Sequence, residues 1–129
     1  MRYEKRITRQ MLQSNPRTLF VFGDNMLRQG LGGQAKEMRG EPNAVGIPTK
    51  HFASMTESAF FRDSDVGYAL PQIYAAFVRL TAHAMAGGEI VWPADGIGTG
   101  LAQLEQRSPK IWQLIEDARK ALSVPNGER

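Results

Sequence analysis

The sequence contains no cysteine. This absence excludes disulfide bonds, thiolate zinc sites and a cysteine nucleophile. Histidine is also scarce, because only His51 and His83 are present and they lie in unrelated parts of the sequence. A zinc site needs several such ligands close together. The composition therefore predicts no metal site and no cofactor.

Long apolar runs are missing as well. No segment approaches the roughly eighteen consecutive apolar residues that a membrane-spanning helix requires. Residues 1–6 are mostly charged and no apolar signal segment follows them. We therefore expect no contact with a membrane and a cytoplasmic location.

The charge is close to balanced, with 16 basic and 13 acidic residues and a formal net charge of +3. This excess is too small to predict nucleic-acid binding by itself, although it slightly favours small anionic ligands. Four of the basic residues cluster near the N-terminus, at Arg2, Lys5, Arg6 and Arg9. Such a cluster is typical of a solvated surface, and a nucleic-acid contact is the alternative.

Length and hydrophobic content indicate one domain. The chain has 129 residues, of which 42% are hydrophobic, enough for a single packed core. We expect this domain to occupy residues 1–124. The remaining residues, 125–129, are polar and contain proline and glycine, so they are predicted to be a disordered tail.

Apolar runs and helical periodicities alternate along the chain. Strands are predicted at 18–22, 44–48 and 89–93, with a short one near 5–7; helices are predicted near 9–13 and at 33–38, 70–86 and 108–122. Residues 49–66 show no clean period and are expected to form a loop. This alternation predicts a small three-layer α/β/α domain with a mostly parallel or mixed sheet.

The two long helices have recognisable faces and boundaries. In 70–86, residues at helical spacing predict a buried apolar face; they are Leu70, Ile73, Tyr74, Phe77, Val78 and Thr81. Gly87 and Gly88 are expected to end this helix. The last helix should begin at Ser108 and Pro109, because serine caps helix N-termini and proline favours the first helical position.

Two glycine-rich segments, 23–33 and 96–100, follow predicted strands. Ligands of open α/β sheets bind at the carboxyl ends of strands, where both segments lie. Glycine allows the backbone to approach a ligand closely, and exposed N–H groups attract phosphate. The pair could hold two adjacent phosphates, whereas the alternative is that the glycines only form tight turns. The spacing matches neither a Walker A motif nor a Rossmann fingerprint.

Several side chains near these segments are candidates for chemistry. Lys50 has three open interpretations: a nucleophile that forms a Schiff base, a phosphate-binding charge or a solvated lysine. Asp24 follows a strand and could bind ribose hydroxyls, act as a base or form a turn with Asn25. Asp95 either faces the same cleft or shapes its own turn. An aromatic ring over a bound base would come from the 49–68 region, from Phe52, Phe60, Phe61 or Tyr68.

Three motifs carry a resemblance to a known group. Residues 19–25 read LFVFGDN, 44–50 read AVGIPTK, and 97–102 read IGTGLA, with GGQA at 32–35 between the first two. This pattern resembles a family of small phage and bacterial proteins, which in turn are similar to macrodomains, the binders of ADP-ribose. The match covers residues 18–50 and 89–115. It implies a macrodomain-like fold and an ADP-ribose-like or other nucleotide ligand.

The resemblance also implies roles for individual residues. Asp24 and Asn25 would lie near the distal ribose or the scissile bond, and Lys50 falls where some ADP-ribosyl hydrolases have a nucleophilic lysine. We therefore expect Lys50 and Asp24 to be the catalytic residues if there is catalysis. The expected ligand-binding residues are Gly23, Asn25, Gly32, Gly33, Gln34, Thr49, Asp95, Gly98, Thr99, Gly100 and Leu101.

Whether the protein turns its ligand over is left open at this stage. The related hydrolases have an acidic residue directly after Gly-x-Gly-Leu, where this chain has Ala102, and the next acid is Glu105. The expectation is a nucleotide-diphosphate binder, with hydrolysis of an ADP-ribosyl linkage as an open second activity. The alternatives are a non-catalytic, phage-type nucleotide sponge and a module that binds nucleic acid or protein.

Overall fold

The computed structural model describes residues 1–124, so the predicted disordered tail at 125–129 lies outside the described residues. Strands and helices alternate as expected. In chain order they are β1 (Arg2–Glu4), α1 (Arg9–Ser14), β2 (Leu19–Asn25), α2 (Ala35–Met38), β3 (Ala44–Lys50), the 3₁₀ helices η1 (Glu57–Ala59) and η2 (Asp63–Asp65), α3 (Val66–Met85), β4 (Ile90–Pro93), α4 (Leu104–Arg107) and α5 (Pro109–Ser123).

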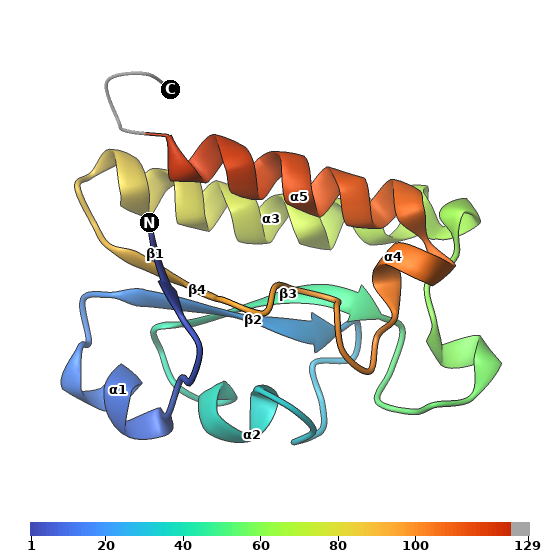
Figure 1. Cartoon of the computed structure of the whole chain (residues 1–129), viewed down its shortest axis with the longest axis horizontal. Helices are drawn as coiled ribbons and strands as arrows, with labels where there is room; N and C mark the ends of the chain where they lie inside the picture. Colours follow the sequence, from blue (N-terminus) through green and yellow to red (C-terminus); the bar gives the residue numbers. More distant parts are fainter. Residues whose placement is uncertain (125–129) are drawn as a thin grey trace.

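The four strands form one sheet in the order β1-β4-β2-β3, and every pairing is parallel. Helices α3 and α5 lie side by side over one face of the sheet, while α1 and α2 lie on the other (Figure 1). The prediction of a small α/β domain is therefore confirmed, and its sheet is parallel rather than mixed. All four strands end at the same edge of the sheet, where the loops after β2, β3 and β4 meet.

Strand β2 shows why the sheet is covered on both faces. Leu19 and Val21 are buried in the larger core, against α3 and α5, whereas Phe20 and Phe22 are buried in the smaller core, with α1 and α2. Successive side chains of a strand point to opposite faces, so a continuous apolar run requires two covered faces. The strand is longer than predicted and includes Asp24 and Asn25, which were expected in the following loop.

Helix α3 begins four residues before its predicted start, and its buried face differs from the predicted one. Ile73 and Phe77 are buried as expected, but Leu70, Tyr74 and Val78 are exposed. Leu80 and three alanines, Ala69, Ala76 and Ala84, complete the buried face instead. Small side chains let the helix approach the sheet closely. The positions of the large apolar side chains alone therefore do not reveal which face of the helix is buried.

Other expectations need smaller corrections. The first strand is Arg2–Glu4 and not 5–7, because residues 2–4 are the ones that pair with β4. Helix α4 was not predicted, and the 49–66 segment contains two 3₁₀ helices rather than loop alone. Gly87, with φ +85°, ends α3 as expected. Pro109 begins α5, although the Ser108 hydroxyl bonds the carboxylate of Asp63 instead of capping the helix.

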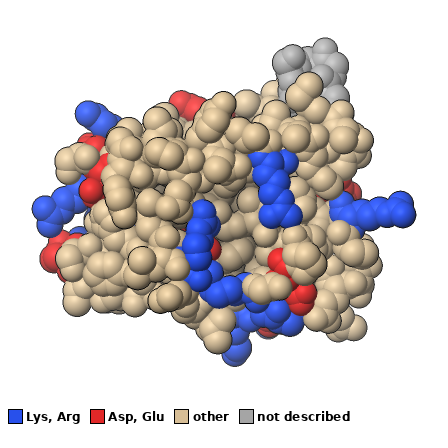
Figure 2. Space-filling model, turned by 180° about the vertical axis from the view of Figure 1, so that it is seen from behind, with Lys and Arg blue, Asp and Glu red and all other residues tan. Residues whose placement is uncertain are grey.

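Strand β3 is an edge of the sheet, and its outer side is covered by arginine side chains. Arg28 Nη1 donates to Gly46 O at 2.7 Å, and Arg79 Nη2 donates to Pro42 O at 2.8 Å. Figure 2 shows basic side chains gathered across the middle of the face opposite to that of Figure 1. Such capping, together with Pro48, hinders pairing with another strand. Within residues 1–124 no helix is both long and apolar enough to cross a membrane.

Candidate functional site

A cavity of about 300 Å³ lies where β2, β3 and β4 end. Its walls come from the segments 23–35, 49–53 and 95–102, together with Arg39. Apart from the aromatic candidates for a base, the thirteen residues predicted to bind or transform a ligand all line this one cavity, although they come from three separate stretches of the chain. The parallel sheet brings them together, because all of these stretches follow the carboxyl ends of strands.

Residues 96–102, here called the glycine wall, present backbone rather than side chains. Gly96 and Gly98 have φ values of +91° and +77°, which L-residues rarely adopt. The turn is closed by Thr99 Oγ1, which donates to Asp95 O at 2.7 Å, and by Leu104 N, which donates to Gly98 O at 2.9 Å. A Cβ on Gly98 would come within 2.8 Å of Leu104 Cβ. Glycine is therefore required at position 98, because the backbone there passes too close to Leu104 to leave room for a side chain.

The amides of the glycine wall are free for a ligand. Within residues 1–124, none of the backbone N–H groups of residues 98–102 has a hydrogen-bond acceptor. Most of these residues are exposed or half-exposed at the cavity. Consecutive unpaired amides in a turn form an anion-binding concavity. This wall is suited to phosphate or carboxylate oxygens.

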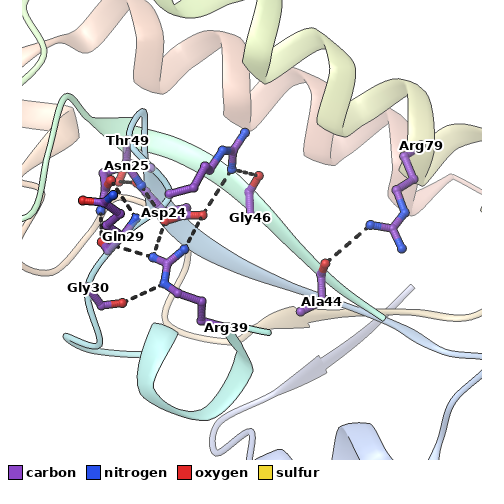
Figure 3. A network of polar contacts seen from close by, with 10 residues as sticks. Asp24, Asn25, Gln29, Gly30, Arg39, Ala44, Gly46, Thr49 and Arg79 are labelled. Carbon is purple, nitrogen blue, oxygen red and sulfur yellow. Dashed lines mark hydrogen bonds and ion pairs between the residues drawn. The ribbon is translucent and has the colours of Figure 1, made fainter. Parts of the chain in front are cut away.

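A second wall of the cavity presents charged side chains instead of backbone. This charged wall consists of Asp24, Arg39 and Lys50. Asp24 is 7% exposed and accepts from Arg39 through both carboxylate oxygens, at 2.5 and 3.2 Å. Arg28 adds a third contact at 3.2 Å. Figure 3 shows Asp24 beside Arg39. A Cβ on Gly46 would lie 2.6 Å from Asp24 Oδ2, so only glycine leaves room for this carboxylate.

These contacts also hold the loop that follows β2. Arg39 Nε donates to Gly30 O at 2.7 Å, and Asn25 Nδ2 donates to Gln29 O at 2.7 Å. Both oxygens of the Asp24 carboxylate are already occupied by guanidinium donors. The contacts therefore favour a positioning role for Asp24, and its catalytic role stays a prediction.

Lys50 ends β3 with its side chain largely covered and 9% exposed. Its Nζ donates to Ser54 O and lies 4.6 Å from the centre of the Phe60 ring. Arg107 contacts the same ring, with its Cζ 3.7 Å from the centre. Burial, and secondarily the positive charge of Arg107, hold the pKa of the Lys50 amine below its usual value. A lowered pKa raises the fraction of neutral amine, which is the nucleophilic form.

Sequence reasoning missed Arg39, whose guanidinium organises one side of the cavity. No motif marks it, because it follows a four-residue helix and reaches Asp24 across 15 positions of sequence. The aromatic residues predicted to cover a base do not line the cavity: Phe60 and Phe61 are buried, and Phe52 and Tyr68 lie outside its walls. These residues were predicted because the 49–68 region was expected to be a loop beside the ligand, whereas two of them are buried in the protein interior.

His51 follows Lys50 but points away from the cavity. Its Nε2 lies 3.1 Å from Asp65 Oδ2, and its ring packs against Phe61 and Tyr68. Burial raises the pKa of Asp65, but the backbone N–H of Arg62 and the contact with His51 outweigh it and hold that pKa below its usual value. The pair fixes the 51–65 segment to the start of α3. Within the described part of the chain no group of three potential metal ligands comes together.

The comparisons with known proteins identify a family but no activity. A model of a family of unknown function (DUF7831) matches residues 2–118, which is nearly the whole chain. No curated protein and no solved structure matches it. The chain belongs to the DUF7831 family.

Proposed function

We propose that this DUF7831 member binds a nucleotide diphosphate, such as ADP-ribose, with its phosphates in the cavity between the charged wall and the glycine wall. The observation that carries the proposal is the run of free amides at residues 98–102 beside that cavity. Five consecutive N–H groups without acceptors favour an anion with several oxygens, which a diphosphate offers. The macrodomain-like motifs in the sequence point to the same ligand class.

The charged side chains that line the cavity nearly balance each other. Asp24 and Asp95 offset Arg39 and Lys50 among the side chains that line the cavity. Phosphate selection would therefore rest on the backbone amides, and Lys50 would add one positive charge. The N-terminal basic cluster is less available to nucleic acid, because Arg2 pairs with Glu4 and Glu89 while Arg9 pairs with Glu41. These ion pairs favour the small-ligand proposal over a nucleic-acid module.

The proposal is tested by thermal shift with ADP-ribose, NAD, ADP, AMP and cyclic nucleotides on the wild type and on Gly100→Glu. Gly100 has no atom within 4 Å of an added Cβ, so the variant should fold while its carboxylate repels phosphate. Gly67→Glu is the matched control, because Gly67 is equally open but lies in α3 outside the cavity. A nucleotide-induced shift that only Gly100→Glu loses supports the proposal.

No shift with any nucleotide would contradict it. In that case a salt titration of nucleic-acid binding becomes decisive, since phosphate contacts made by basic side chains weaken steeply with salt. A site that holds its ligand through backbone amides inside a cavity should depend much less on salt. Loss of nucleic-acid binding with rising salt, without any effect of Gly100→Glu, would favour the interaction-module alternative.

Binding without turnover is favoured over hydrolysis. Ala102 stands where an acid would be needed, and the Asp24 carboxylate is engaged by Arg39 and Arg28. Such a protein would sequester its nucleotide in a bacterium or an infecting phage, in the manner of a sponge. Release of ADP-ribose from a modified substrate at a rate that Lys50→Ala abolishes would instead establish a hydrolase with Lys50 as its nucleophile.

A further inference from the structure

A second cavity, of about 330 Å³, adjoins the first on the side of β1 and α5. It shares Asp95, Gly96 and Thr99 with the first cavity, so only the short turn at 94–99 separates the two. Ala94, Asp95 and Thr99 are exposed on this turn. A single extended ligand that lies over the turn can therefore occupy both cavities.

The second cavity is lined by aromatic side chains. Tyr3 comes from β1, Trp92 from β4 and Trp112 from α5. Trp92 is fully buried, Trp112 is half-buried and Tyr3 is 42% exposed. Aromatic side chains that are partly exposed can stack on a planar ring, and such stacking tolerates different substituents on the ring.

One buried donor at this cavity lacks a hydrogen-bond partner. Arg119 is paired with Glu116 through two contacts of 3.0 Å and donates to Tyr3 Oη at 2.7 Å, so these charges satisfy each other. Trp92 Nε1, in contrast, has no hydrogen-bond partner within residues 1–124. A buried donor without an acceptor calls for an explanation, and an acceptor on a bound molecule is one. The cavity thus suits an uncharged ring that carries an acceptor atom.

We propose that this second cavity, the ring cavity, binds the heterocyclic base of the nucleotide whose phosphates lie against the glycine wall. The inference rests on the proposed function, because the shared turn connects the two cavities. The base would stack against Trp112 and Tyr3, and Trp92 Nε1 would offer it a buried donor that has no partner within residues 1–124. Tyr3 and Trp112 would thus take the stacking role that was expected of aromatic residues in the 49–68 region, which do not line the cavity beside Lys50.

The test uses intrinsic fluorescence. The chain contains two tryptophans and both line the ring cavity, so a stacked base should quench the emission directly. Excitation at the red edge of tryptophan absorption avoids absorption by adenine. We expect quenching by ADP-ribose and by adenosine, and none by inorganic pyrophosphate, which has no ring and should only raise the melting temperature.

Variants separate the ring cavity from the phosphate site. Ala94→Phe fills the ring cavity from an exposed position and retains both tryptophans, and Trp112→Leu removes one aromatic wall. Each should weaken ADP-ribose binding about tenfold, the usual worth of one stacked base, and leave the response to pyrophosphate unchanged. Tyr74→Leu is the matched control, since this exposed aromatic residue of α3 lies outside both cavities.

The outcomes distinguish the two proposals. ADP-ribose binding that is lost in Gly100→Glu but unchanged in Ala94→Phe and Trp112→Leu, without quenching, overturns the ring cavity and leaves the proposed function standing. Adenosine quenching that Gly100→Glu leaves intact, without any response to pyrophosphate, overturns the proposed function and the bridging ligand with it. Loss of quenching in Ala94→Phe with a retained pyrophosphate shift supports both.

Discussion

The charged wall and the glycine wall border the same cavity but are held by different interactions. In the charged wall, Asp24 and Arg39 form a largely buried ion pair that also fixes the loop after β2. In the glycine wall, residues 96–102 carry no titratable side chain, and the turn is held by backbone geometry and by Thr99. One wall has its side chains occupied in stabilising it, while the other keeps its amides free. The comparison favours a positioning role for the charged wall, which holds the loop after β2, and a ligand-binding role for the glycine wall.

The largest effect that separates the walls should come from Arg39→Met. This change leaves the buried Asp24 carboxylate with Arg28 as its one cationic partner within residues 1–124, beside the backbone N–H of Asn25, and releases the carbonyl of Gly30. Removing one partner of a buried ion pair typically costs about 3 kcal/mol of unfolding free energy. Urea denaturation of the variant should show a loss of this size. The matched control is Arg79→Met, because Arg79 is exposed and contacts only backbone carbonyls.

A loss in Arg79→Met as large as that in Arg39→Met would contradict the assignment of a special role to the Asp24 pair. The double variant Asp24→Asn with Arg39→Met sharpens the test. It removes the buried charge together with its partner, so it should recover part of the stability lost in the single variant. No recovery would mean that Arg39 acts mainly through the loop carbonyls and not through Asp24.

The next effect concerns the backbone of the glycine wall. Gly98→Ala places a Cβ within 2.8 Å of Leu104 Cβ on a residue with φ +77°, so both crowding and backbone strain oppose it. We expect a loss of about 2 kcal/mol in unfolding free energy. Gly100→Ala is the matched control, because it meets no atom within 4 Å and its φ is not positive. Equal stabilities of the two variants would show that the glycine wall adapts freely.

These two walls also differ in how far the sequence predicted them. The glycine wall was predictable, because the spacing of Gly96, Gly98 and Gly100 after an apolar strand is a local pattern. The apolar run at 18–22 likewise predicted a doubly covered strand, and the parallel sheet followed from alternation. The pairing of Asp24 with Arg39 was not predictable, since it joins side chains from β2 and from the end of α2.

Two other failures have the same physical origin. Half of the buried residues of α3 are alanines, whose small size matters only once the distance of the helix from the sheet is known. The ring cavity brings together Tyr3, Trp92 and Trp112, which are distant in sequence and which no sequence motif marks. Local patterns predict elements and turns, whereas contacts between elements depend on the packing distances of the completed fold.

The smallest effect is a dependence on pH that only the charged wall should show. Burial and Arg107 lower the pKa of folded Lys50 from its ordinary value of 10.5. Between the lowered pKa and 10.5 the unfolded chain therefore binds more protons at this site than the folded chain does. The unfolding free energy should rise with pH across this window and level off above it. The rise is small because a single lysine contributes to it.

Lys50→Met removes this contribution, so the difference in unfolding free energy between wild type and variant should change with pH only in the alkaline window. Urea denaturation at a series of pH values measures it. Lys36→Met, at an exposed position of α2, is the control for removing a lysine. The loss caused by Gly98→Ala should be constant over the same range, because the glycine wall has no group to titrate. A pH-independent difference for Lys50→Met would mean that the amine is as well hydrated as in the unfolded chain. Lys50 would then have an ordinary amine that is no better a nucleophile than an exposed lysine, and the charged wall would consist of Asp24 and Arg39.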